Sequence, residues 1–489
     1  MTDKVTLGKL ATGVPGLDVL LGGGLNEFSF NLISGAPGCG KTTMAHQIMF
    51  ALAGPGRRAL FFTVLGEPPL KMLRYQQQYA FFDMDKVGTS IRYVNLTADL
   101  RAGDFNCVLE RITKEVEDFA PSMVFVDSFR SVIQTGRGGN EGTSDLQYFV
   151  QELGTRMTSW MATTFLIGEY QQNEVEANPI MTVADGMVAL SQQQEGDAVV
   201  RKIRVVKMRG QAHMSGSHTF RITSNGLRIY PRLLPPLAAG LHEGAPVDTD
   251  PTRIPTGTPG LDDMLHGGLP QGHSMLAIGP TGCGKTIMGT RFLQAGVALG
   301  ETGVVMSFEK GTGRLRNAGM AAMVRAGQVV LVESRLIDLT MEELEDELLA
   351  AIDRTGARRV VIDSLSEVPL YLAPECIRNL REGVFRMLSS LAKRGVTVLV
   401  TVGLDEQALN MNYARADMAY ITDAIVAMRY AEVDGQVRRY MAVVKVRGSS
   451  HSADVREYRV TDDGLEIDPI AAPVNGVLFG RTDYVNSGD

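Results

Sequence analysis

Two stretches decide the fold of this chain, Gly35-Ala36-Pro37-Gly38-Cys39-Gly40-Lys41-Thr42 and Gly279-Pro280-Thr281-Gly282-Cys283-Gly284-Lys285-Thr286. Both fit the pattern G-x-x-x-x-G-K-[ST], in which glycines allow backbone N–H groups to close around phosphate oxygens. The lysine of this pattern reaches the outer phosphates, and the threonine hydroxyl holds a magnesium ion. One match arises by chance on the order of a few per cent of the time in a chain of this length, but two in register do not. The sequence therefore predicts two nucleotide-binding sites.

The two loops belong to a repeat that runs through the chain. The segment Thr12-Gly13-Val14-Pro15-Gly16-Leu17-Asp18 recurs as Thr256-Gly257-Thr258-Pro259-Gly260-Leu261-Asp262, with the same offset of 244 residues that separates the loops. A constant offset indicates two copies of one domain. We expect a first domain over residues 1–230, a proline-rich linker over 231–250, a second domain over 251–468 and a tail over 469–489.

Apolar runs of strand length alternate with helical segments in each copy. Matching runs cover residues 30–34, 59–63 and 123–127, and then 275–278, 304–308 and 360–363. This alternation predicts a doubly wound α/β fold with a mainly parallel sheet in each copy. Asp127 and Asp363 end matching strands, where a carboxylate can hold magnesium beside Thr42 and Thr286.

The bulk composition is that of an ordinary globular protein. Of 489 residues, 44% are apolar and 21% are charged, and no apolar run is long enough for a membrane span. The N-terminus lacks the pattern of a secretion signal, and the four cysteines show no metal-binding spacing. A net charge of −7 argues against a large nucleic-acid footprint. We expect a cytoplasmic protein.

A late signature adds to the loops. It reads Lys207-Met208-Arg209-Gly210-Gln211-Ala212-His213 and is echoed by Lys445-Val446-Arg447-Gly448-Ser449-Ser450-His451. Together with the two phosphate loops and the repeated segments 12–18 and 256–262, called the opening motif, this signature makes the chain similar to the KaiC family of RecA-like ATPases. The similarity covers roughly residues 8–468. In that family, the lysine, arginine and histidine reach the nucleotide of a neighbouring subunit. A basic hairpin on a solvated face is the alternative interpretation.

The resemblance implies two tandem RecA-like P-loop domains in a two-tiered homo-hexameric ring. It also implies ATP and Mg²⁺ at the subunit interfaces, with a KaiB-like or other signalling protein as partner. From the charge and the short apolar runs we expect neither nucleic acid nor a membrane as partner. In the first copy, the expected nucleotide contacts are Gly35, Gly38, Gly40, Lys41, Thr42, Thr43, Asp127, Lys207, Arg209 and His213. In the second, they are Gly279, Thr281, Gly282, Gly284, Lys285, Thr286, Ile287, Asp363, Lys445, Arg447 and His451.

The catalytic glutamates match the family only in part. The family places two adjacent glutamates after the second strand, one of which polarises the attacking water. The second copy keeps Glu309 and replaces the other with Lys310, and the first copy offers Glu67 if one residue is inserted. Both glutamates are candidate general bases, and the alternative for each is a solvated loop carboxylate. We expect slow hydrolysis that can differ between the rings.

The family's phosphorylation sites are missing from the second copy. The adjacent serine and threonine that clock members phosphorylate fall on Ala419 and Tyr420, and a third site falls on Ala414. An autokinase would need another acceptor, Thr422 or Tyr420. Two further alternatives are a recombinase-like ATPase that binds single-stranded DNA and a scaffold that uses ATP only for assembly.

Two lesser features carry open alternatives. Cys39 and Cys283 lie beside the loop lysines at a helix N-terminus, a setting that lowers a thiol pKa and suggests redox sensitivity. The alternative is a small residue chosen to fit a tight turn. Glu169 and Asp405 follow matching strands, where each is either a phosphate sensor or an exposed carboxylate.

Overall fold

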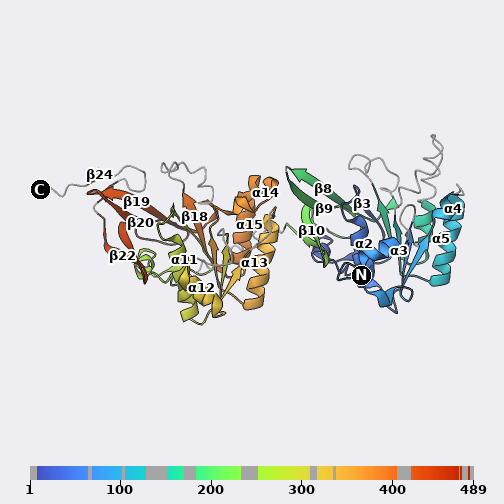
Figure 1. Cartoon of the computed structure of the whole chain (residues 1–489), viewed down its shortest axis with the longest axis horizontal. Helices are drawn as coiled ribbons and strands as arrows, with labels where there is room; N and C mark the ends of the chain where they lie inside the picture. The colour runs from blue at the N-terminus through green and yellow to red at the C-terminus, as the bar shows by residue number, and fades with distance from the viewer. Residues whose placement is uncertain are drawn as a thin grey trace, which may run out of the picture. The chain divides into compact units, whose positions relative to one another are not determined.

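The chain forms two compact units, Met1–Arg232 and Leu233–Asp489, which repeat one architecture (Figure 1). The computed structural model describes residues 8–63, 69–101, 105–127, 151–157, 159–169, 183–195, 197–232, 252–308, 317–333, 338–404, 420–472, 474–475 and 483–484. Among these residues, no helix combines the length and the apolar character needed to cross a membrane.

The first unit is built on a nine-stranded sheet in the order β11-β10-β9-β8-β3-β7-β6-β4-β5. Its strands are β3 (Phe30–Gly35), β4 (Ala59–Thr63), β5 (Ile91–Asn95), β6 (Met123–Asp127), β7 (Thr163–Gly168), β8 (Gly186–Glu195), β9 (Ala198–Met208), β10 (His218–Thr223) and β11 (Gly226–Tyr230). The strands from β8 to β5 are parallel, and β9, β10 and β11 continue the sheet as antiparallel neighbours. Its described helices include α1 (Leu17–Leu20), α2 (Lys41–Leu52), α3 (Pro69–Gln76), α4 (Thr97–Arg101) and α5 (Phe105–Phe119), and residues 151–157 are helical as well.

The second unit repeats this sheet in the matching order β16-β15-β17-β18-β14-β19-β20-β21-β22. Its strands are β14 (Ser274–Pro280), β15 (Gly303–Ser307), β16 (Val329–Val332), β17 (Arg359–Asp363), β18 (Thr397–Leu404), β19 (Ala424–Val433), β20 (Gln436–Val446), β21 (Val455–Thr461) and β22 (Gly464–Ala471). Its described helices are α10 (Pro259–Met264), α11 (Lys285–Ala298), α12 (Ala318–Arg325), α13 (Met341–Thr355), α14 (Pro374–Arg378) and α15 (Leu380–Lys393). The predicted fold class, two tandem RecA-like α/β domains, is confirmed.

The central parallel strands are apolar throughout because helices cover both faces of the sheet. In the second unit, α13 and α15 pack on one face with Val360 and Ile362, while α11 and α12 pack on the other with Val361 (Figure 1). Such strands read as continuous apolar runs instead of alternating patterns, which is why the sequence marks them clearly.

The repeated opening motif holds the loop helix in each unit. The Asp18 carboxylate accepts hydrogen bonds from the backbone N (2.9 Å) and Oγ1 (2.7 Å) of Thr12, and the Asp262 carboxylate accepts one from the Thr256 N (2.7 Å). Gly13, at φ 69°, lies so close to α2 that a Cβ there would be 2.2 Å from the Ala51 Cβ. Only glycine fits this turn and this contact.

His46 is a buried polar residue in the core of the first unit. Its Nδ1 donates a hydrogen bond to the Thr42 carbonyl (2.7 Å), and its ring lies 4.5 Å from the Phe61 ring and 6.0 Å from the Tyr93 ring. Burial lowers the pKa of His46 from 6.5 to about 4, because the apolar surroundings disfavour the imidazolium. Thr290 occupies the matching position in the second unit and donates to the Thr286 carbonyl (2.9 Å).

Arg359 ties the second unit together from the start of β17. Its side chain is 1% exposed, and it donates to Glu301 (2.6 Å) and to the carbonyls of Pro255 (2.6 Å) and Phe292 (3.1 Å). The guanidinium carbon lies 4.9 Å from the centre of the Phe292 ring. One side chain thus joins the opening motif, α11 and the central sheet. The first unit has Met123 at the matching position.

The low pKa of His46 predicts an acid-sensitive first unit. Between pH 7.5 and pH 5 the unfolded chain takes up a proton at this imidazole while the folded chain does not. The first unit should therefore lose about 2 kcal/mol of stability over this range. His46→Gln should remove this loss and His213→Gln should keep it, as measured by urea denaturation followed through Trp160, the one tryptophan of the chain. An unchanged pH profile in His46→Gln would contradict the assignment.

Removal of Arg359 should destabilise the second unit alone. Arg359→Ala opens a cavity and leaves the Glu301 carboxylate unpaired at 26% exposure, so the free energy of unfolding should fall by about 3 kcal/mol. The circular dichroism transition of the second unit should move to lower urea, while the Trp160 fluorescence transition of the first unit should not. Arg358→Ala, at an exposed neighbour, is the control. Equal effects of the two substitutions would show that the buried contacts of Arg359 do not contribute to the stability of the second unit.

Candidate nucleotide-binding sites

Each phosphate loop connects a central strand to a long helix whose N-terminus is open. β3 leads into α2 and β14 leads into α11. Gly40 and Gly284 precede these helices at φ 100° and 103°, and neither helix has a side-chain cap or an acidic residue in its first turn. The first N–H groups of both helices therefore point into the loops without a side-chain acceptor. Such an arrangement is an anion site.

The loop lysines lie folded over their own loops. Lys41 Nζ donates to the Ala36 carbonyl (2.8 Å), and Lys285 Nζ donates to the carbonyls of Gly279 (2.9 Å) and Pro280 (2.8 Å). Both ammonium groups are thereby held over the N-terminal turn of the loop helix. This position fits a lysine that contacts the outer phosphates of a nucleotide.

The proposed magnesium ligands are arranged differently in the two units. In the first, Thr42 Oγ1 donates to the Asp127 carboxylate (2.7 Å). In the second, the Asp363 carboxylate instead accepts a hydrogen bond from Thr401 Oγ1 (2.5 Å). The residue that matches Thr401 is Ile167, because each pairs with the same position of its loop strand. Because Ile167 has no hydroxyl to donate, the Asp127 carboxylate accepts from the loop threonine Thr42.

The donor set suits magnesium with phosphate. The described residues contain no cluster of three side chains able to hold a metal by themselves. Magnesium is commonly bound through one or two carboxylates together with substrate phosphates. Thr42 with Asp127, and Thr286 with Asp363, could hold Mg²⁺ in this way once a nucleotide supplies further oxygens.

The loop cysteines are buried, which argues against the alternative of a redox-sensitive thiol with a lowered pKa. Cys39 and Cys283 are fully buried, and burial raises the pKa of both thiols despite the neighbouring lysines. A Cβ on Gly35 would lie only 2.7 Å from the Cys39 Sγ. This tight packing supports the alternative of a small residue that fits the turn.

The late signature of each unit, residues 207–213 and 445–451, is called the cationic signature below and begins at the end of the first long antiparallel hairpin. Lys207 and Lys445 follow matching β-bulges in β9 and β20. Burial lowers the pKa of both lysines, and the adjacent arginine lowers it further. Lys445 Nζ donates to the Thr422 carbonyl (2.7 Å). In each unit the signature lysine and arginine therefore lie close enough for the arginine charge to disfavour the lysine ammonium.

One aspartate per unit fixes this signature to the start of the loop strand. Asp185 accepts from the Phe30 N (3.0 Å) and pairs with Arg209 (3.3 Å). In the second unit, Asp423 accepts from the Ser274 N (2.9 Å) and pairs with Arg447 (3.5 Å). The sequence interpretation missed both carboxylates. Their position directly before matching strands, β8 and β19, was the signal that could have found them.

The loops and the cationic signatures lie at opposite ends of the same sheet. Met208 pairs with Gly186, which pairs with Asn31 near the start of β3, whereas the phosphate loop follows Gly35 at its end. Strands rise about 3.3 Å per residue, so the two ends are on the order of 15 Å apart. The structure does not bring Lys207, Arg209 or His213 to the phosphate loop of its own unit, and the same holds for Lys445, Arg447 and His451. His213 and His451 instead contact the carbonyls of Met214 (3.2 Å) and Ser452 (2.9 Å).

Several expected residues lie outside the described part of the chain. These are Glu67, Glu309, Asp405, Ala414 and Ala419. Glu169 directly follows β7.

The two alternative phosphate acceptors differ in exposure. Thr422 is 1% exposed, whereas Tyr420 is 65% exposed. Of these two hydroxyls, only that of Tyr420 is accessible in the structure.

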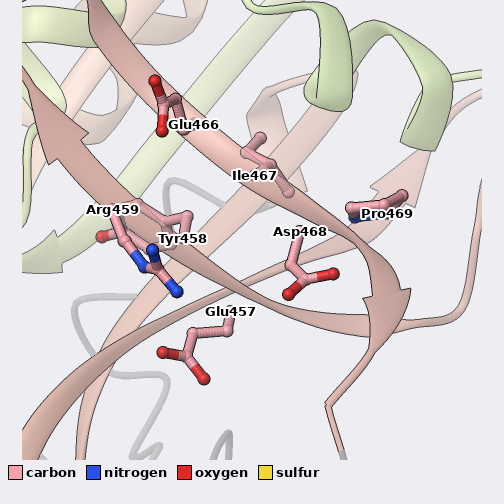
Figure 2. A pocket seen from close by; sticks show the side chains of 7 residues that line it. All are labelled: Glu457, Tyr458, Arg459, Glu466, Ile467, Asp468 and Pro469. Atoms are coloured by element: carbon pink, nitrogen blue, oxygen red, sulfur yellow. The ribbon is translucent and has the colours of Figure 1, made fainter.

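A polar pocket lies on the outer hairpin of the second unit, and one of its lining residues, Tyr458, also contacts the phosphate loop. Figure 2 shows its lining from β21 and β22: Glu457, Tyr458, Arg459, Glu466, Ile467, Asp468 and Pro469. The buried hydroxyl of Tyr458 donates to the Cys283 carbonyl (2.7 Å), and its burial raises the pKa of this phenol. Phe220 occupies the matching place in the first unit and lacks the hydroxyl. The sequence interpretation also missed this contact.

Comparison with known proteins covers both units. The family model of the KaiC ATPase matches residues 10–233 and again 254–472. Circadian clock protein KaiC3 of Synechocystis sp. is 29% identical, over 99% of this chain and 97% of that protein. The circadian clock oscillator protein KaiC of Rippkaea orientalis is 27% identical, and that of Synechococcus elongatus is 26% identical, each over 95% of this chain and 90% of the relative.

The family model covers most of the chain, in two copies that coincide with the two sheets and their phosphate loops. The chain therefore belongs to the KaiC family of ATPases.

Proposed function

We propose that both phosphate loops bind Mg·ATP and that the protein hydrolyses it slowly as a two-tiered homo-hexamer. The separation of each loop from the cations of its own unit is the observation that supports this proposal. Lys207, Arg209 and Lys445 are fixed at the strand end that faces away from the loop. They lie too far from the loop of their own unit to meet its nucleotide, and a second copy that presents its loop to them would complete the site. A ring of head-to-tail contacts satisfies this requirement for every unit.

The chemistry of the site then divides between two protomers. The loop lysine and the first turn of the loop helix hold the phosphates. Bound magnesium would neutralise the charge that develops on the phosphate oxygens during hydrolysis. Arg209 and Arg447 of the neighbour add positive charge at the transferring phosphoryl group. Glu309, and Glu67 in the first unit, orient the attacking water as general bases. The difference between Asp127 and Asp363 supports unequal rates in the two rings.

We further propose that the nucleotide state is read by a partner protein. The relatives are named as circadian clock proteins, which supports a signalling or timing role with a KaiB-like partner. Charge delivered across a subunit boundary links hydrolysis to the shape of the ring. Such a link is what a signalling ATPase requires.

Substitutions within one protomer should separate the two sites. Lys41→Ala and Lys285→Ala should each abolish turnover at one site, and the double variant should release no phosphate above background. Glu309→Gln should lower the remaining rate of a Lys41→Ala chain by about 100-fold without loss of ATP binding, because the loss falls on water activation. Phosphate release and filter binding of labelled ATP measure these effects. If Glu309→Gln keeps the parent rate, Glu309 is not the base.

Complementation should show the contribution in trans. In a Lys285→Ala background, Lys41→Ala and Arg209→Ala chains should each be inactive at the first site. Mixed in equal amounts, they should recover about a quarter of the parent rate, since that share of interfaces combines an intact loop with an intact arginine. Arg58→Ala, which removes an arginine distant in sequence from the signature, serves as the control substitution in place of Arg209→Ala and should keep activity before mixing. No recovery from assembled mixtures would exclude an arginine supplied by the neighbour.

A further inference from the structure

Two tyrosine hydroxyls contact the backbone of the phosphate loop in the second unit. Tyr458 Oη donates to the Cys283 carbonyl (2.7 Å), and Tyr430 Oη donates to the Thr281 carbonyl (3.3 Å). Tyr458 is 2% exposed, so water does not compete for its hydrogen bond. The Arg439 guanidinium carbon lies 5.5 Å from the centre of the Tyr430 ring and helps to fix that ring. We refer to Tyr430 and Tyr458 together as the tyrosine pair.

Both hydrogen bonds fall on peptide groups that precede left-handed glycines. Gly282 (φ 80°) follows Thr281, and Gly284 (φ 103°) follows Cys283. Because glycine has the widest choice of backbone conformations, the loop can rotate most freely at these two positions. A hydrogen bond to the preceding carbonyl fixes the peptide plane on one side of each glycine. The tyrosine pair therefore restrains the loop where its own sequence restrains it least.

The contact of Tyr458 also orients a donor to phosphate. The Cys283 carbonyl and the Gly284 N–H belong to one trans peptide, so they point in opposite directions. Because the carbonyl is directed at Tyr458, the N–H is directed away from it. In this motif the loop N–H groups close around phosphate oxygens. A hydrogen bond to the carbonyl polarises the peptide group and makes its N–H a stronger donor.

The first unit lacks both hydroxyls. Phe220 takes the place of Tyr458 in the outer hairpin. A Cβ on Gly40 would lie 3.8 Å from Phe220 Cε2, so this ring also lies beside its loop. Gln192 takes the place of Tyr430 in the strand next to the loop strand, and it is exposed. The two loops share their glycines, but only the second is held by the tyrosine pair.

We propose that the tyrosine pair positions the second phosphate loop for nucleotide, so that this site holds Mg·ATP more tightly than it would with the phenylalanine and glutamine of the first unit. The inference rests on the proposed function and adds two positioning residues to it. A loop held in its binding conformation loses less conformational entropy when the nucleotide binds. In the first unit the nucleotide itself must order the loop, and this ordering weakens binding.

Removal of one hydroxyl tests the proposal. In a Lys41→Ala chain, where only the second site is intact, Tyr458→Phe should raise the dissociation rate of labelled Mg·ATP about fivefold, as measured by filter binding during a chase with unlabelled ATP. Phosphate release at saturating ATP should change by less than about twofold, because the hydroxyl acts through the loop backbone and not on the reacting groups.

A second tyrosine provides the control for this substitution. Tyr440 is 1% exposed and lies in a separate apolar cluster with Ala431 and Val433. Tyr440→Phe removes a hydroxyl from the same unit and should keep the dissociation rate of the Lys41→Ala parent. Equal dissociation rates for Tyr458→Phe and Tyr440→Phe would overturn the inference and leave the proposed function standing.

Transfer of the hydroxyl to the first unit is the converse test. In a Lys285→Ala chain, where only the first site is intact, Phe220→Tyr should slow the dissociation of labelled Mg·ATP about threefold, because the new hydroxyl can donate to the Cys39 carbonyl. A merely structural role of Tyr458 does not predict this gain. An unchanged or faster dissociation rate would contradict the inference.

Hydrogen exchange of the free protein measures whether the loop is held before nucleotide binds. Without nucleotide, the amides of residues 279–286 should exchange several times faster in Tyr458→Phe than in wild type, while those of residues 35–42 should not change. Equal exchange of residues 279–286 in the two proteins would overturn the inference. A wild-type chain that binds no labelled ATP at either site would overturn the proposed function as well.

Discussion

The direction of the central strand of each unit is the constraint on which the proposed chemistry depends. At the start of β3 and β14, the backbone N–H of the first residue donates to an aspartate that also pairs with the signature arginine. At the other end, each strand leads into a phosphate loop. A strand is stiff and has two ends, so the signature arginine and the phosphate loop of one unit lie apart. This separation supports the proposed site shared between protomers, and it gives Asp185 and Asp423 a structural task at the far end of the strand that carries the loop.

Around this shared frame the two units have diverged in their supporting contacts. The second unit has Arg359, Thr401 and Tyr458 where the first has Met123, Ile167 and Phe220. Each of these changes adds a polar contact to the second unit: one to the opening motif, one to Asp363 and one to the loop carbonyl of Cys283. Because buried hydrogen bonds limit the movement of the groups that they hold, these contacts restrain the Pro255 carbonyl, Asp363 and the Cys283 carbonyl in the second unit.

Much of the site could be predicted because its chemistry is local. The phosphate loops require glycine at left-handed positions next to a helix N-terminus, and both requirements fall within eight consecutive residues. The thiol pKa could not be predicted in this way. The lysine beside Cys39 is visible in the sequence, but the burial that outweighs it comes from a core cluster that also contains residues far along the chain, such as Leu190.

The sequence by itself determined the tandem repeat, the doubly wound fold and the family, because apolar periodicity, glycine positions and spacing are properties of short segments. Only the tertiary structure decided which hydroxyl Asp363 accepts from, since Thr401 lies 38 residues away and is brought near by parallel pairing. It also decided that the cations and the loop of one unit lie apart. Strand order and direction set these distances, and they depend on the packing of the whole sheet.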